Sequence, residues 1–288
     1  MGMRVFVGGR RSRRLAGAVL ALGFLAVTSE QYSWSQRASA PGTSACRFEP
    51  TAAGKVTRII DGRSFVLDDG REIRLAGIEV PPASRRGERG DPAGAAATAA
   101  LTTILADRSV QIGRGSADRY GRIVAYVNVV VDDEPRPVNQ ATVASGDARV
   151  SALVDTPGCA VELLRSEREA RAAKLGLWAN PYYTVVGAES GAALLAERGH
   201  FTIAEGRVVS ARESGGSVYV NFGRRWSEAL TVTISKRNER IFAAAGLPPK
   251  TLEGRRVRVR GWVEERNGPR IEAARPEQIE IAERNASD

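Results

Sequence analysis

The sequence has only one histidine, two cysteines and four lysines, and these shortages exclude several kinds of site. Two cysteines do not make a zinc site, and the single histidine, His200, lies far from both of them in the sequence. Because lysine is scarce, arginine carries nearly all of the positive charge. Hydrophobic residues make up 43% of the 288-residue chain, which argues against wholesale disorder and suffices for two modest domains or one large one.

The excess of positive charge is concentrated at the N-terminus. Of the formal net charge of +9, residues 1–53 carry +5, residues 54–184 carry +1 and residues 185–288 carry +3. If the first segment is removed, the remaining protein is only mildly basic. The overall charge is therefore a weak argument for a nucleic-acid partner.

Acidic residues are missing before Glu30, and no apolar run reaches the ~20 residues of a comfortable bilayer span. Five arginines precede the apolar stretch from Leu15 to Val27, which is the pattern of a secretory signal. We predict that residues 1–28 form a signal peptide or an uncleaved N-terminal anchor. The protein is then exported, either periplasmic or secreted, or held at the inner membrane by this segment alone.

The two cysteines, Cys46 and Cys159, form an even count in an exported chain, which predicts a disulfide. That disulfide would join the segment before the first domain to the approach to its last helix. Two unrelated buried thiols are the alternative.

Short β-like runs bounded by Gly or Asp-Gly begin at residue 54 and follow a Ser-, Ala- and Pro-rich linker, residues 29–53. In residues 54–184, three strands precede a helix that Asp91 caps and Pro92 starts, and two strands and further helices follow. Residues 185–200 connect this unit to residues 201–288, which have the β-β-β-α-β-β order of an OB fold. The fold class is mainly β with α.

Five motifs carry a family resemblance: "DGRSFVL", "IRLAGIEVPP", "DRYGRIVAYV", "VNQATVASGDA" and "SEREARAAKLGLW". With these motifs, residues 54–184 resemble the thermonuclease family, the staphylococcal-nuclease-like (TNase-like) domain. The resemblance implies a staphylococcal-nuclease-like OB barrel with flanking helices. The strand order of residues 201–288 predicts a second, five-stranded OB-like barrel after it.

The resemblance also implies a site in which two Asp bind calcium, a Glu activates water and two Arg hold the phosphate. Both arginines are present as Arg74 and Arg122, whose planar guanidinium groups suit phosphate oxygens. The first calcium-binding Asp is replaced by Arg63, the second by Glu79, and the general base falls on Pro82. We expect the calcium site to be lost and no cofactor to be bound. Whether the protein is an enzyme is left open.

Arg63 is expected to pair with Glu79 in place of the missing calcium. The pocket would then hold Arg63, Arg74 and Arg122 as an anion site, and Tyr120 either lines it or packs in the core. Alternatively, the two family arginines pair with carboxylates and only hold the barrel mouth closed.

The second barrel offers Arg256, Arg258 and Arg260 on one face of "RRVRVRGW", next to Trp262, while Val257 and Val259 face the other way. This face could bind single-stranded nucleic acid. A solvated outer strand face is the alternative.

These patterns favour an exported thermonuclease-family protein with a degenerate site, a pseudoenzyme. It would bind single-stranded nucleic acid or another phosphate-bearing, nucleotide-like anion without efficient hydrolysis. Two alternatives stay open. One is an active nuclease that cleaves phosphodiesters with rearranged acids such as Glu88 or Asp91. The other is a structural or interaction protein with a partner in the cell envelope.

Overall fold

The first β-sheet is built around a long strand, β1 (Pro50–Asp61), in the computed structural model, which describes residues 46–82, 91–153 and 157–282. The predicted signal segment 1–28, most of the linker and Glu88 lie outside the described residues. All described residues belong to one compact unit, Thr43–Asp288. Within them, no helix is long and apolar enough to cross a membrane.

The strands of this sheet have the connections of an OB fold. They are β1, β2 (Ser64–Leu67), β3 (Glu72–Leu75), β5 (Ser109–Gly113), β6 (Ser116–Ala117), β7 (Ile123–Ala125), β8 (Val127–Val131) and β9 (Glu134–Pro137). Their order is β6-β7-β3-β2-β1-β5-β8-β9, with β3 and β7 parallel. Only Tyr126 separates β7 from β8, so one continuous stretch of chain joins both sides of the sheet. A small second sheet pairs β4 (Ile78–Glu79) with β10 (Arg149–Val150).

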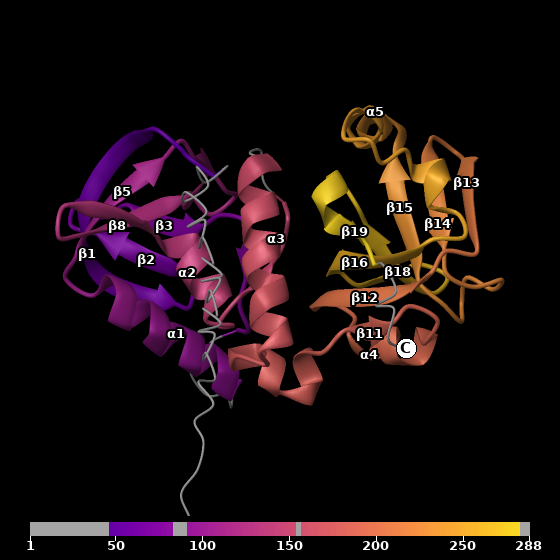
Figure 1. Ribbon diagram of the computed structural model, residues 1–288, viewed down its shortest axis with the longest axis horizontal. Coiled ribbons are helices and arrows are strands. Elements are labelled where there is room, and N and C mark those ends of the chain that lie inside the picture. The colour runs from indigo at the N-terminus through magenta and orange to yellow at the C-terminus, as the bar shows by residue number, and fades with distance from the viewer. Residues whose placement is uncertain (1–45, 83–90, 154–156, 283–288) are drawn as a thin grey trace, which may run out of the picture. The chain divides into compact units, whose positions relative to one another are not determined.

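Three helices flank this sheet: α1 (Pro92–Leu105), α2 (Val138–Ala144) and α3 (Pro157–Ala172). As predicted, the Asp91 side chain caps α1 by accepting a hydrogen bond from the Ala93 N–H, and Pro92 occupies the first turn. α1 packs against β1, and α2 packs against α3 and β8 (Figure 1). α3 ends at Ala172, and a short 3₁₀ turn (Gly176–Ala179) follows it.

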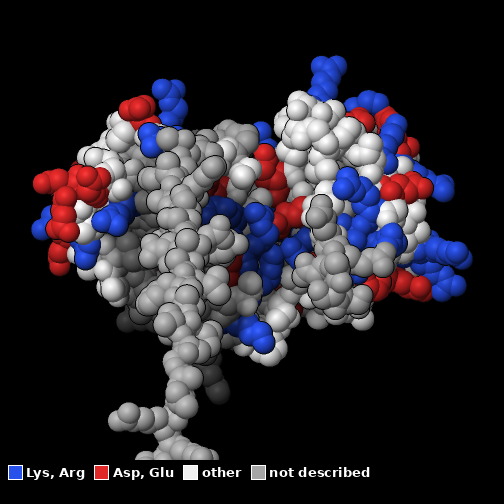
Figure 2. Space-filling model, in the orientation of Figure 1, with Lys and Arg blue, Asp and Glu red and all other residues white. Residues whose placement is uncertain are grey.

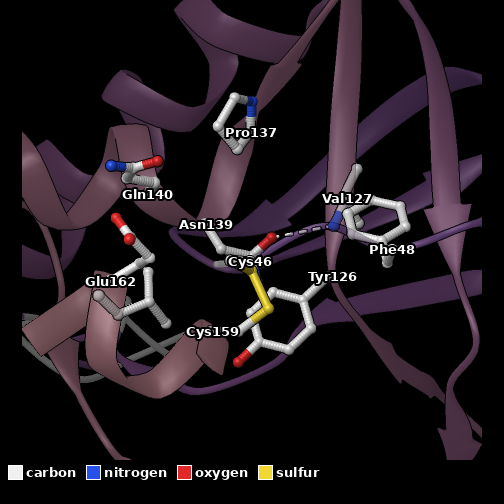
Figure 3. A pocket seen from close by; sticks show the side chains of 10 residues that line it. Cys46, Phe48, Tyr126, Val127, Pro137, Asn139, Gln140, Cys159 and Glu162 are labelled. Carbon is white, nitrogen blue, oxygen red and sulfur yellow. Dashed lines mark hydrogen bonds between the residues drawn. A yellow bond between two sulfur atoms is a disulfide. The ribbon is translucent and has the colours of Figure 1, made fainter. Parts of the chain in front are cut away.

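The predicted disulfide between Cys46 and Cys159 is present and spans 113 residues. Figure 3 shows the bond beside the Tyr126 ring, in a small pocket that Phe48 also lines. Cys159 is fully buried on α3, and β1 begins four residues after Cys46. The disulfide therefore fastens the start of the first sheet to its last helix. β1 also begins earlier than residue 54, because Pro50 to Lys55 pair with β5.

The second half of the chain repeats the OB connections. Its strands are β11 (Val186–Gly187), β12 (Phe201–Arg207), β13 (Ser210–Ser214), β14 (Ser217–Asn221), β15 (Thr231–Ser235), β16 (Arg256–Trp262), β17 (Glu264–Glu265), β18 (Pro269–Glu272) and β19 (Ile279–Ile281). They form the sheets β11-β12-β16-β19 and β13-β14-β15-β18-β17, with β15 and β18 parallel. β12 continues into β13, and β16 into β17, after breaks of one or two residues, so both sheets belong to one strand circuit.

The turns and helices of this half follow the sequence signals. The Asn-Gly turn joins β17 to β18, and Asn267 and Gly268 both have positive φ, 57° and 132°. α4 (Gly191–Ala196) lies in the connector, and α5 (Lys236–Ala244) ends just before Gly246, whose φ is +74°. β11 pairs with β12, so the sheet begins inside the predicted connector 185–200. The predicted domain boundaries at 184 and 201 stay predictions.

The prediction that Arg256, Arg258 and Arg260 form an exposed face of β16 is wrong for Arg260, which is fully buried. Val257 and Val259 point into the core as predicted, but the opposite face is covered by α3 at Arg260. Arg260 Nη1 donates to Glu167 Oε2 on α3 (2.8 Å) and to the Val150 carbonyl oxygen (2.9 Å), and Nη2 pairs with Glu280. Burial by itself lowers the pKa of Arg260, but the two carboxylates outweigh it and raise the pKa. A strand pattern shows which residues share a face, but not whether another element covers that face.

Candidate functional site

Arg63 enters the site from the tight turn between β1 and β2. The Asp61 carboxylate accepts a hydrogen bond from the Arg63 N–H (2.9 Å), which holds the turn. Gly62 lies so close to α1 that a Cβ built on it would come within 2.6 Å of the Ala97 Cβ. A glycine is therefore required where the turn approaches the helix.

The Arg63 guanidinium forms the expected ion pair with Glu79, and it also donates to the Ile78 carbonyl oxygen (3.0 Å). The two side chains are only 11% and 13% exposed. The Asp61 and Glu79 carboxylates thus already serve Arg63 as acceptors. Two carboxylates are also few for a calcium ion, which takes about six to eight oxygen ligands. Within residues 46–82, 91–153 and 157–282, no group of three or more His, Cys, Asp or Glu could hold a metal ion.

Arg74, on β3, is half-buried and forms no ion pair with a carboxylate of the described residues. Burial lowers the pKa of Arg74, and the neighbouring positive charges of Arg63 and Arg122 lower it further. Glu79 and Asp61 act in the opposite direction but do not outweigh these effects. The charge of Arg74 is thus poorly compensated, which favours the approach of an anion.

Arg122, in contrast, is paired. Its Nη2 lies 2.7 Å from Asp118 Oδ2, and its Nε lies 3.9 Å from Glu72 Oε1. The hydrogen bond to Asp118 raises the pKa of Arg122. Tyr120 is 71% exposed, so it is no core residue, and its ring centre lies 5.0 Å from the Arg122 guanidinium carbon.

These residues line a cleft of about 910 Å³ whose walls come from both OB units and the segment between them. The lining includes Asp61, Arg63, Arg74, Glu79, Pro82, Asp91, Tyr120, Arg122, Arg149, Tyr182, Tyr183, Glu197, His200, Phe201, Thr202 and Trp262. The four residues expected at an anion site, Arg63, Arg74, Arg122 and Tyr120, are therefore brought together in one cleft.

Arg149 is a lining residue that the sequence did not suggest. It lies on β10 opposite Glu79, and its guanidinium carbon is 5.2 Å from the ring centres of both Tyr183 and Phe201. Its Nε is buried without a hydrogen-bond partner in the described part of the chain. Burial lowers the pKa of Arg149, and Glu167 and Glu79 offset part of that effect. No motif marks this arginine, because the two-residue strand that positions it pairs with residues 70 and 72 positions away.

Of the nucleic-acid-binding residues expected on β16, only Trp262 lines the cleft. Arg256 and Arg258 both pair with Glu205 on the neighbouring strand β12, at 2.7 Å in the case of Arg256 Nε. On the face that Figure 2 shows, Lys and Arg likewise lie beside Asp and Glu over the second unit. The row of three arginines does not form an uncompensated surface.

Asp91 is the other acid considered for rearranged catalysis. Its carboxylate caps α1 and accepts a hydrogen bond from the Tyr183 hydroxyl. Both oxygens of this carboxylate therefore already accept hydrogen bonds from groups of the protein.

The OB connections, the flanking helices and the arginine-lined cleft define a protein of the staphylococcal nuclease class. The family model "Staphylococcal nuclease homologue" matches residues 72–180. Among curated proteins, Protein ParB of Escherichia coli is 31% identical over 182 residues, which cover 60% of this chain and 89% of that protein. The chain belongs to the staphylococcal nuclease homologue family.

Two further relatives each match 44% of this chain. An uncharacterized endonuclease of Escherichia coli is 31% identical over 130 residues, which cover 44% of this chain and 77% of that protein. A micrococcal nuclease of Shigella flexneri is 29% identical over 136 residues, which cover 44% of this chain and 74% of that protein.

Proposed function

We propose that this nuclease-family protein binds single-stranded nucleic acid, or another phosphate-bearing anion, in the cleft without efficient hydrolysis. The observation that carries the proposal is the Arg63–Glu79 ion pair beside Arg74, which pairs with no carboxylate in the part of the chain that the structure describes. The Arg63 guanidinium pairs with the carboxylate that the family resemblance assigns to calcium, while the Arg74 guanidinium has no carboxylate partner among the described residues.

Binding is favoured by the state of Arg74. Arg74 is half-buried, so part of its hydration is lost, and no carboxylate of the described residues pairs with it. A phosphate oxygen can supply the missing acceptors in a bidentate arrangement. Arg122 and Arg149 add positive charge to the same cleft.

Efficient hydrolysis is disfavoured for two reasons. The position that the resemblance assigns to the general base is Pro82, which has no titratable group, and loss of a positioned base costs about 10²–10⁴-fold in rate. The positive charge of Arg63 also repels a divalent cation from Glu79 and Asp61.

Export to the periplasm or the medium is part of the proposal. It rests on the basic and apolar pattern of residues 1–28 and on the Cys46–Cys159 disulfide, since disulfides persist in oxidising compartments. Cell fractionation with mass spectrometry of the mature N-terminus tests it, and a reduced protein in the cytoplasmic fraction would contradict it.

The function is tested by two measurements on the same protein. Binding of a labelled single-stranded oligonucleotide is followed by fluorescence anisotropy at several salt concentrations, and digestion of the same oligonucleotide is assayed with added calcium. We expect salt-sensitive binding without digestion, because released counter-ions make phosphate binding salt-dependent.

Arg74→Ala should weaken this binding, whereas Arg71→Ala should not, since Arg71 pairs with Asp69 outside the cleft. Calcium-dependent digestion that Arg74→Ala abolishes would instead show an active nuclease. A protein that shows neither activity and co-purifies with an envelope protein would support a structural role.

A further inference from the structure

The second OB unit contributes aromatic side chains to the cleft next to the arginines of the first. We propose that Trp262 stacks on an unpaired base of a single-stranded nucleic acid whose phosphate contacts Arg74. This inference rests on the proposed function and goes further, because it assigns the base-binding wall of the cleft to the second unit and selects the ligand class.

Trp262 is positioned for this role by β16. It is the last residue of that strand, and it is 46% exposed although Val257 and Val259 on the same strand are fully buried. Across the sheet its partner is Phe201, and the two rings meet edge to face with centres 6.4 Å apart. The indole is thus held from one side and open to the cleft from the other.

Arg149 links this aromatic wall to the phosphate-binding arginines. Its guanidinium lies near the rings of Phe201 and Tyr183, and it forms no ion pair with a carboxylate of the described residues. Positive charge and aromatic rings that alternate along one groove are the combination that binds single strands, because bases stack while phosphates contact cations.

The same combination discriminates against other ligands of the phosphate class. A free phosphate or a phosphorylated sugar would use Arg74 but gain no stacking energy from Trp262. A duplex already stacks its bases on one another, so it offers no free base face to the indole. Single-stranded nucleic acid uses both walls of the cleft.

The test compares two ligands of equal length and charge on the full chain: oligothymidylate and an abasic oligonucleotide. We expect oligothymidylate to bind more tightly. Trp262→Ala should weaken its binding about 5- to 150-fold, the range for loss of one stacking contact. Binding of the abasic strand should not change, and Trp262→Phe should restore most of the affinity for oligothymidylate.

Trp226→Ala is the matched control. Trp226 is 55% exposed and also lies in the second unit, but it stacks on Tyr219 and does not line the cleft. Its removal should change neither affinity.

The failures are distinguishable. If neither oligonucleotide binds, the proposed binding of single-stranded nucleic acid fails and the inference with it. If both oligonucleotides bind equally and Trp262→Ala changes neither affinity, the cleft binds phosphate, but the proposed stacking on Trp262 is wrong. Equal weakening of both by Trp262→Ala and Trp262→Phe would also overturn it, since the tryptophan then only maintains the shape of the cleft.

Discussion

The two OB units of this chain share their strand connections but differ in how their arginines are compensated. In the first unit, Arg74 lines the cleft without a carboxylate partner in the described residues. In the second, Arg256 and Arg258 pair with Glu205, and Arg260 pairs with Glu167 and Glu280. Attraction for an anion therefore depends on the carboxylates around each guanidinium, and neither the fold nor the number of arginines predicts it.

The strongest way to break this comparison is to restore acids to the first unit. In the double variant Arg63→Asp, Pro82→Glu, the arginine that occupies Glu79 is gone and a carboxylate stands at the base position. We expect calcium-dependent cleavage of single-stranded DNA to rise by about 10²–10⁴-fold over the unmodified protein. Pro82→Glu alone keeps the Arg63–Glu79 pair and should show no such gain. Equal cleavage by the unmodified protein would contradict the proposed loss of hydrolysis.

The second unit can be challenged at its buried arginine. Arg260→Ala leaves Glu167 buried with Arg171, 3.7 Å away, as its nearest remaining cation. We expect the free energy of unfolding to fall by about 3–5 kcal/mol, as when one partner of a buried pair is removed. Arg256 lies on the same strand in a half-exposed ion pair. Arg256→Ala should lower the free energy of unfolding by about 1 kcal/mol or less. Urea denaturation measures both, and equal losses would show that burial does not separate the two arginines.

The disulfide exists only in the first unit and gives a third contrast. Replacement of both cysteines by Ala should lower the free energy of unfolding by about 2–5 kcal/mol, because the open chain gains freedom when it unfolds. The control is a reductant. If it destabilises the unmodified protein but not the double Ala variant, the loss of stability is due to the disulfide. An unchanged denaturation midpoint in reductant would contradict this expectation.

The smallest effect concerns pH. Burial raises the pKa of Glu280, but Arg260 and Arg258 outweigh it and hold the pKa below its ordinary value of 4.5. A lowered pKa means that the charged pair stabilises the fold above pH 4.5, and that this contribution is lost as the pH falls through the lowered pKa. Glu280→Gln should therefore flatten the loss of stability below pH 4.5. Glu169→Gln, in an exposed pair with Arg165, should leave the acid limb unchanged. If the stability of Glu280→Gln and of the unmodified protein falls equally steeply below pH 4.5, this assignment is contradicted.

Much of the candidate site followed from the sequence. The OB connections, the Asp91 cap of α1, the Cys46–Cys159 bond and the Arg63–Glu79 pair were all predicted and are present. The strands, the turns and the helix cap depend on alternation and capping chemistry within short stretches of chain. The cysteine pair is the only pairing that two cysteines allow.

The sequence alone thus established which residues share a strand, a turn or a motif. Only the tertiary structure decided that Arg260 is buried, that Arg149 joins the cleft and that Trp262 faces it. The reason is physical: each outcome depends on contacts between segments 52 to 110 residues apart, and the charge and exposure of a side chain are set by what packs against it.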